Sequence, residues 1–124
     1  MIVRVRDAAF IETPGGNFGA AIATPSRDAT EVSVIRQRQM PGGANPLHSH
    51  DREEVLVMLA GSVTVAFAGQ QQRVGAGDAV IVPAETPHSV TNAGSEPAEW
   101  LLVSPAGVRF FHANGDEATL PWSR

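Results

Sequence analysis

The stretch Gly42-Gly43-Ala44-Asn45-Pro46-Leu47-His48-Ser49-His50-Asp51-Arg52-Glu53-Glu54 contains two of the four histidines of the chain, and Gly61 follows it after an apolar run. Alternate side chains of a β-strand share one face, so His48 and His50 project side by side. Two neutral imidazoles held in this way can bind one metal ion, and a carboxylate beyond a turn can add an anionic ligand. The polar residues 51–53 suit such a turn. This stretch therefore predicts a metal site at the end of a strand.

A second segment supplies a further candidate ligand. His88 follows an apolar strand pattern, Ala79 to Val82, and a turn that contains Pro83 and Pro87. Together the two segments resemble the motifs of the cupin superfamily, G-x5-H-x-H-x3,4-E-x6-G and G-x5-P-x-G-x2-H-x3-N. The first motif, over residues 42–61, matches at Gly42, His48, His50, Glu54 and Gly61. The second, over residues 77–92, matches at Gly77, Pro83, His88 and Asn92.

The second motif departs from the family pattern at one position, where Glu85 stands in place of glycine. Glycine at such a place serves a backbone angle that residues with a Cβ avoid, so the glutamate indicates a variant turn or a carboxylate at the pocket mouth, the variant turn being favoured. The stretch between the motifs, residues 62–76, is short, as in small bacterial cupins.

The resemblance implies an all-β fold, the double-stranded β-helix or jelly-roll barrel of the cupins, with a metal ion inside one end. The implied ligands are His48, His50, Glu54 and His88, three neutral nitrogens and one carboxylate. This set suits a divalent transition metal such as Fe, Mn, Ni, Zn or Cu. One extra residue in the turn would exchange Glu54 for Glu53, although the spacing favours Glu54. The fourth histidine, His112, lies outside both motifs and is expected to pack or to face solvent.

The rest of the sequence is consistent with such a fold. Glycine and proline divide the chain into short segments rich in Val, Ile, Thr and Phe, which is typical of antiparallel sandwiches and barrels. No amphipathic helix of ten residues or more is expected, and no linker divides residues 1–124, so we predict a single domain. We expect residues 14–19 to form a turn that joins an N-terminal strand to the barrel. Strands are expected over Val32–Met40, Val55–Ala60, Ser62–Phe67, Gln71–Val74, Ala79–Val82, His88–Asn92, Trp100–Val103 and Val108–His112.

Composition excludes several chemistries and partners. The 124 residues include no Cys, no Tyr and no Lys, which excludes thiolate, phenol and Schiff-base chemistry. The net charge of −4, without a basic run, argues against nucleic acid and anionic membranes as partners. The sequence shows neither a signal-peptide pattern nor an apolar run long enough to span a bilayer, so a cytoplasmic protein is expected.

The segment Arg36-Gln37-Arg38-Gln39 is unusually polar for a strand that leads into the first motif. Alternation sends Arg36 and Arg38 to one face and Gln37 and Gln39 to the other. Either the segment is a solvated edge, or one of these pairs lines the barrel, where an arginine could hold a substrate carboxylate. All four residues are therefore candidates for substrate binding.

The apolar segment within the first motif bears on the oligomeric state. Residues 55–59 are apolar on both faces, so one face needs cover from a second sheet or subunit. This predicts a homodimer, with the N-terminal strand and the C-terminal tail, residues 113–124, in the contact.

The sequence thus favours a mononuclear metal-dependent enzyme that acts on a small polar organic molecule. An iron oxygenase is narrowly preferred to an isomerase or a decarboxylase. The alternative is a non-catalytic, metal-dependent cupin that binds or senses a small ligand. Because an imidazole must be neutral to bind a metal, affinity is expected to weaken as the pH falls through about 6.

Overall fold

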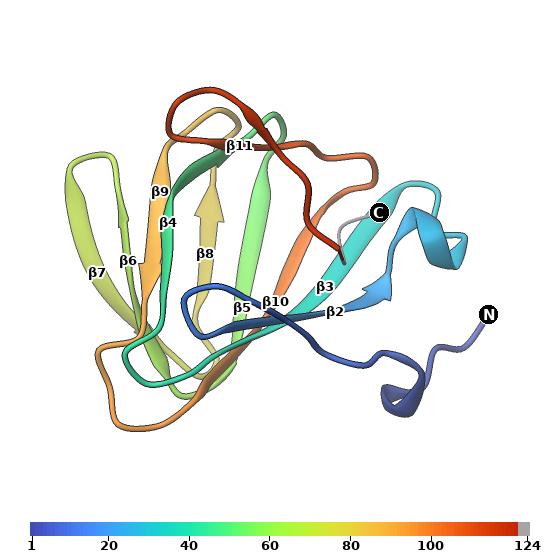
Figure 1. The fold of residues 1–124 in the computed structure, drawn as a ribbon, viewed down its shortest axis with the longest axis horizontal. Coiled ribbons are helices and arrows are strands. Elements are labelled where there is room, and N and C mark those ends of the chain that lie inside the picture. The colour runs from blue at the N-terminus through green and yellow to red at the C-terminus, as the bar shows by residue number, and fades with distance from the viewer. Residues whose placement is uncertain (122–124) are drawn as a thin grey trace.

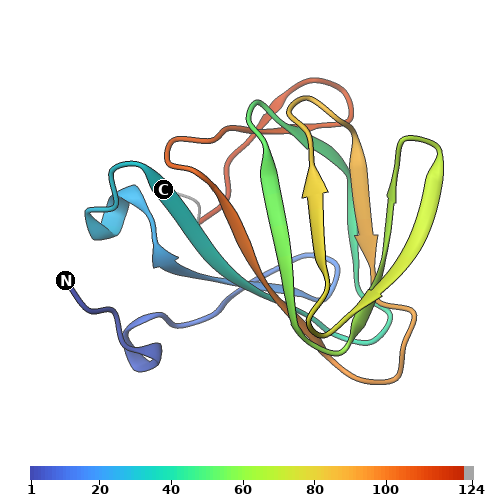
Figure 2. The same cartoon turned by 180° about the vertical axis from the view of Figure 1, so that it is seen from behind.

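Two antiparallel β-sheets face each other in the computed structural model, which describes residues 1–121 (Figure 1, and from behind in Figure 2). The first sheet has the order β1-β2-β3-β10-β5-β8 and the second β12-β11-β4-β9-β6-β7. Strands of the first sheet are β1 (Ile11–Thr13), β2 (Asn17–Ala23), β3 (Val32–Gln39), β5 (Glu54–Ala60), β8 (Ala79–Val82) and β10 (Ala98–Pro105). Strands of the second are β4 (Ala44–His50), β6 (Ser62–Phe67), β7 (Gln70–Gly75), β9 (His88–Thr91), β11 (Phe110–His112) and β12 (Glu117–Ala118). The predicted jelly-roll barrel is confirmed.

The core lies between the two sheets because their strands alternate buried and accessible side chains. In β5, Leu56 and Met58 are buried, whereas Val55 and Val57 on the other face are only half-buried. β10 alternates in the same way over all of its eight residues. This period of two turns one face of each strand toward the barrel interior. The core cluster joins Ile35, Leu56, Met58, Trp100 and Leu102 of the first sheet to Val63, Val65, Val90 and Phe110 of the second.

Most expected strands are present, with bounds that differ by one or two residues. The N-terminal region differs more, because residues 14–16 form the expected turn but residues 17–23 are a further strand, β2. Four of its seven residues, Gly19, Ala20, Ala21 and Ala23, are small, and Ile22 is the one β-branched residue, so the segment carries little of the composition that usually reveals a strand. β2 covers one side of β3 and β10 covers the other, so the interpretation of residues 36–39 as a sheet edge is wrong.

Gly61 ends the first motif in a turn that tolerates no side chain. Its φ is +69°, and a Cβ there would lie 2.5 Å from the carbonyl oxygen of Pro97. β5 and β6, which belong to different sheets, meet at this turn. The glycine therefore permits the chain to cross between sheets in a single residue.

Outside the sheets, the described residues form only two short 3-10 helices, η1 (Val5–Asp7) and η2 (Pro25–Arg27). Among residues 1–121, no helix has the length and apolar character needed to cross a membrane. The N-terminal arm extends away from the barrel in both views, and Met1 and Ile2 are 89% and 72% exposed (Figures 1 and 2). At the other end, residues 122–124 of the predicted contact tail lie outside the described residues.

Candidate metal centre

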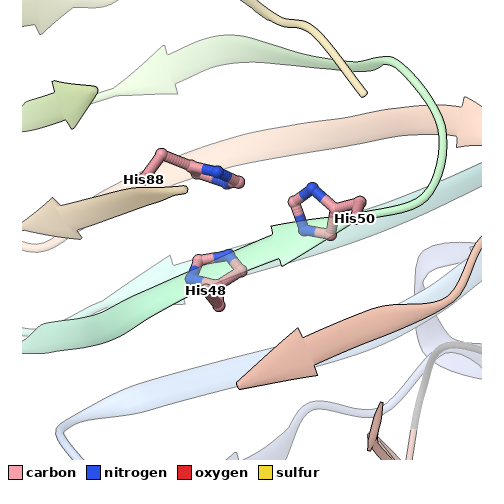
Figure 3. Close-up of side chains that lie close together, drawn as sticks. All are labelled: His48, His50 and His88. Atoms are coloured by element: carbon pink, nitrogen blue, oxygen red, sulfur yellow. The ribbon is translucent and has the colours of Figure 1, made fainter. Parts of the chain in front are cut away.

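Three histidines come together at one end of the barrel (Figure 3). His48 and His50 project from β4, and His88 is the first residue of β9. The ring centroids of His48 and His88 are 4.2 Å apart, and those of His50 and His88 are 4.7 Å apart. One nitrogen from each ring lies within 4.8 Å of the others. The side chains are thus positioned to bind a single metal ion.

Strand register explains the approach of the two histidine segments. β4 and β9 pair antiparallel, with His48 directly opposite His88. The register shifts between Asn45 and His48, so three residues of β4 span what two residues of β9 span. Such an irregularity re-aims the side chains that follow it. His50, one pleat further along, then lies on the same face as His48, as the spacing predicted.

Backbone carbonyls orient two of the three rings. Nδ1 of His48 lies 2.8 Å from the carbonyl oxygen of Pro46, and Nδ1 of His88 lies 2.9 Å from that of Thr86. A carbonyl only accepts hydrogen bonds, so each Nδ1 carries the proton and donates it. Each Nε2 then keeps its lone pair for a metal ion.

The buried polar atoms of the centre fit a bound cation. Both ring nitrogens of His50 and Oε2 of Glu54 are buried without a hydrogen-bond partner among the described residues. His50 Nε2 and Glu54 Oε1 are 3.3 Å apart and do not form a hydrogen bond. Unpartnered buried polar atoms are costly, and a metal ion bound by lone pairs would remove that cost.

Burial keeps the imidazoles neutral, which is the form that binds metals. Desolvation, with repulsion from neighbouring histidines, lowers the pKa of His50 to about 2. Desolvation likewise lowers the pKa of His88 to about 4 and lowers the pKa of His48. These shifts move the contribution of the histidines to the pH dependence of metal affinity from about pH 6 toward lower pH.

Glu54 approaches the same centre from the opposite sheet. It is the first residue of β5, is 1% exposed, and follows the turn formed by residues 51–53. Burial raises the pKa of its carboxyl group well above the ordinary value. A carboxylate in this position therefore needs a cation beside it. Its neighbour Glu53, the alternative considered from the sequence, is exposed.

A cavity of about 270 Å³ opens onto these residues. His48, Glu54 and His88 form one side of it. Most other lining side chains are apolar, among them Phe18, Leu56, Val90, Trp100, Leu102, Phe110 and Leu120. The histidine cluster thus lies at the edge of a chamber with mostly apolar walls.

The four candidate substrate-binding residues of β3 separate onto the two faces of the strand, as alternation predicted. Gln37 lines the cavity, and Gln39 is fully buried in hydrogen bonds to Asn17 and the Val90 carbonyl. Arg36 and Arg38 both bind Glu99, at 2.8 Å and 2.6 Å. Arg38 also contributes to the cavity wall, but its guanidinium bonds to Glu99 and stacks on the Phe10 ring, 4.4 Å from the centroid.

His112 is a cavity residue that the sequence did not reveal. It is exposed, as expected, but it lines the cavity and pairs directly with His48 across β11 and β4. No motif marks this position, and only the alternation of Phe110, Phe111 and His112 on an expected strand could have suggested a shared face. Glu85 has a φ of 60°, in the left-handed region that favours glycine, and its exposed side chain is not among those that line the cavity.

A family model described as the cupin domain matches residues 35–104, more than half of the chain. The chain belongs to the cupin family. The matched segment contains both motifs and all three clustered histidines. Cupins commonly bind metal ions, which agrees with the arrangement of this cluster.

Two curated relatives resemble the chain in sequence. Germin-like protein 3-7 from Oryza sativa subsp. japonica is 34% identical over 98 residues, which cover 69% of this chain and 42% of that protein. Auxin-binding protein 1 from Arabidopsis thaliana is 30% identical over 82 residues, which cover 59% of this chain and 41% of that protein. This cupin therefore spans less than half the length of these relatives.

Among solved structures, the polyketide cyclase RemF from Streptomyces resistomycificus superposes with a TM-score of 0.78 at 22% identity, covering 97% of this chain and 87% of that one. A predicted oxalate decarboxylase from Thermotoga maritima superposes with a TM-score of 0.75 at 23% identity, covering 86% and 99%. At these identities the likeness shows the shared fold alone.

Proposed function

We propose that this cupin is a mononuclear, divalent-metal-dependent enzyme that acts on a small organic molecule, with His48, His50, Glu54 and His88 as the metal ligands. One observation carries the proposal: nitrogens of His48, His50 and His88 lie within 4.8 Å of one another, and His48 and His88 line a cavity of about 270 Å³. A metal ion held there would supply Lewis-acid or redox chemistry to a molecule in the cavity.

The protein's own residues would prepare this centre before any ligand arrives. The carbonyls of Pro46 and Thr86 keep the protons of His48 and His88 on Nδ1. Phe110 packs edge-on against His50, with ring centroids 4.7 Å apart, and shields it from solvent. Glu54 contributes the negative charge that offsets part of the charge of the ion.

Oxygenation is the reaction class that we favour, over isomerisation or decarboxylation. Proton-transfer chemistry needs a free acid or base, and the chain has no Tyr, Lys or Cys to provide one. In the cavity wall, His48, Glu54 and His88 are assigned to the metal, which leaves His112 at the surface. The solved cupins named polyketide cyclase and oxalate decarboxylase indicate the other classes to be compared.

Metal analysis followed by oxygen uptake tests this proposal. Protein purified without added metal is expected to contain about one divalent ion per chain, and oxygen uptake is measured with diketones, thiols and phenolic acids. Substrate-dependent uptake supports an oxygenase. Stoichiometric metal without turnover of any compound supports the alternative, a metal-dependent binding or sensor cupin. Protein without metal, even after reconstitution with iron, manganese, nickel, zinc or copper, contradicts both.

A homodimer is the assembly that we propose for this chain. A row of apolar side chains crosses the outer face of the first sheet, with Val34, Val103, Val55 and Ile81 paired in register. Ile81 is 61% exposed, and Leu59 on the same sheet is 43% exposed. A second copy of the sheet would cover this row. Light scattering at micromolar concentration should give twice the chain mass, and Ile81→Glu should give monomers. A monomeric wild type would refute the proposal.

A further inference from the structure

Gln37 carries a hydrogen-bond donor whose direction is fixed by a tryptophan. Gln37 on β3 and Trp100 on β10 are direct cross-strand neighbours, and Trp100 is 1% exposed. The indole Nε1 donates to Oε1 of Gln37 at 2.7 Å. An indole N–H can only donate, so the amide oxygen must face it. The amide NH₂ of Gln37 therefore points elsewhere.

This NH₂ group has no acceptor among residues 1–121, the part of the chain that the structure describes. Gln37 is half-buried and lines the cavity that also contains His48, Glu54 and His88. A ligand that fills the cavity would remove water from this donor. Unless the ligand offers an acceptor, the donor would lose its hydrogen bonds to water, which is unfavourable.

The two arginines that flank Gln37 in the sequence are already engaged. Glu99 accepts hydrogen bonds from both Arg36 and Arg38. Its carboxylate and the Phe10 ring therefore occupy the guanidinium group of Arg38, the one arginine of the cavity wall among the described residues. A ligand carboxylate would have to displace Glu99, whereas a neutral carbonyl needs only the free amide donor.

The apolar part of the cavity wall indicates which kind of ligand would fit. Leu56, Val90, Leu102 and Phe110 are apolar, and the indole of Trp100 adds an aromatic surface. The volume of about 270 Å³ exceeds the roughly 150 Å³ of an apolar cavity that holds benzene. The chamber therefore has room for an aromatic ring with short substituents.

We propose that Gln37, oriented by Trp100, is the specificity-determining residue of this cavity, and that it donates a hydrogen bond to the carbonyl oxygen of a small aromatic ketone whose second oxygen faces the histidine cluster. This inference rests on the proposed function for the role of the cluster. According to this inference, the ligand carbonyl is recognised on the wall formed by β3 and β10. The group that recognises it is a neutral amide and not an arginine.

The test compares two probes of similar shape, 4-hydroxyacetophenone and 4-ethylphenol, of which only the first has a carbonyl group. Dissociation constants for both are measured calorimetrically with the full chain, metal-loaded and metal-free. Gln37→Glu retains an acceptor for the Trp100 indole but replaces the NH₂ donor with an oxygen. Gln37→Met removes the donor without adding charge. The exposed Gln72, changed to Glu, is the matched control for the added charge.

The expected result is that both Gln37 variants weaken the ketone relative to 4-ethylphenol by about three- to tenfold, the contribution of one hydrogen bond. Gln72→Glu should leave this ratio unchanged. An unchanged ratio in the Gln37 variants overturns the inference, and so does a wild type that binds neither probe at millimolar concentration.

Metal content distinguishes this inference from the proposed function. If the wild type holds no metal but its ketone preference still depends on Gln37, the recognition role stands and the metal-dependent enzyme fails. If metal is bound stoichiometrically and the preference does not depend on Gln37, the metal centre stands and the recognition role fails.

Discussion

The cavity of this cupin has two walls that differ in how their polar atoms are partnered. The wall formed by β4 and β9 carries the histidine cluster, in which both ring nitrogens of His50 are buried without partners, and Glu54 from β5 lies beside it. The wall formed by β3 and β10 is a packed surface in which Gln37 and Trp100 bond to each other. In the first wall, the unpartnered polar atoms of His50 and Glu54 fit a bound metal ion. In the second, Trp100 satisfies the amide oxygen of Gln37, and the NH₂ group of Gln37 is left as a donor for a ligand.

The largest effect is expected at the metal wall. His50→Ala should abolish stoichiometric metal binding, because it deletes one of the four proposed ligands and leaves a gap in the cluster where the buried imidazole stood. Elemental analysis of protein purified at neutral pH measures this. His112→Ala is the control, since His112 lines the same cavity but is exposed and outside the cluster. Full metal in His50→Ala would show that the ligand assignment is wrong.

Glu54→Gln should reduce metal affinity at least roughly tenfold, the lower bound found for outer-shell partners of a metal. The amide keeps the size of the side chain but removes its charge. At neutral pH the same change should leave the metal-free fold as stable as the wild type or more stable, because an uncompensated buried carboxyl group is removed. Competition with a chelator and thermal unfolding of the metal-free forms measure the two effects. Equal affinities would exclude Glu54 as a ligand.

The pH dependence of metal binding should come chiefly from Glu54. Its pKa is raised by burial, so in the metal-free protein the carboxyl group must lose a proton before it binds, and a lower pH then favours the metal-free form. The histidines compete little, because burial keeps their pKa values low, near 4 for His88. Between about pH 5 and the raised pKa of Glu54, wild-type affinity should rise by up to roughly tenfold per pH unit, and that of Glu54→Gln should stay nearly flat. Parallel slopes would contradict this assignment.

A change in the opposite wall should leave the metal in place. Trp100→Phe removes the indole donor and part of the core volume, with an expected loss of about 1–2 kcal/mol in the free energy of unfolding. Metal content should remain stoichiometric, because the histidines belong to other strands. Urea unfolding and elemental analysis measure both quantities. Loss of metal in this variant would mean that the two walls depend on each other.

The smallest effect is expected at Glu85, in the turn before His88. Its φ of 60° costs a residue with a Cβ roughly 1 kcal/mol. Glu85→Gly should relieve this strain and raise the free energy of unfolding by about 0.5 kcal/mol, after the extra chain entropy of glycine is counted. Ala84→Gly, at a neighbouring position without positive φ, should be destabilising instead. A loss of stability in Glu85→Gly would show that the glutamate side chain stabilises the turn.

Much of the metal wall was predictable from the sequence because its information is local. The spacing of His48 and His50 placed both on one face of a strand, and the structure confirms that they lie together with His88. The position of Glu54 after a three-residue turn agrees with its burial beside His50, although its role as a ligand stays a prediction. The barrel itself followed from short apolar segments between glycines and prolines.

The opposite wall was not predictable, because its contacts join residues far apart in the chain. β2 was missed because its small side chains carry no clear alternation. For that reason β3 looked like a sheet edge, and its arginines looked free to bind a substrate. Glu99, about sixty positions away, engages both Arg36 and Arg38. His112 enters the cavity only because β11 pairs with β4.

The sequence by itself determined the fold family, the strand that presents two histidines on one face, and the absence of thiol, phenol and amine chemistry. Tertiary structure alone decided which polar groups are free inside the barrel, since a hydrogen bond between distant strands leaves no trace in local periodicity. Alternation specifies the face on which a side chain lies. Only the packing of the two sheets specifies what that side chain meets.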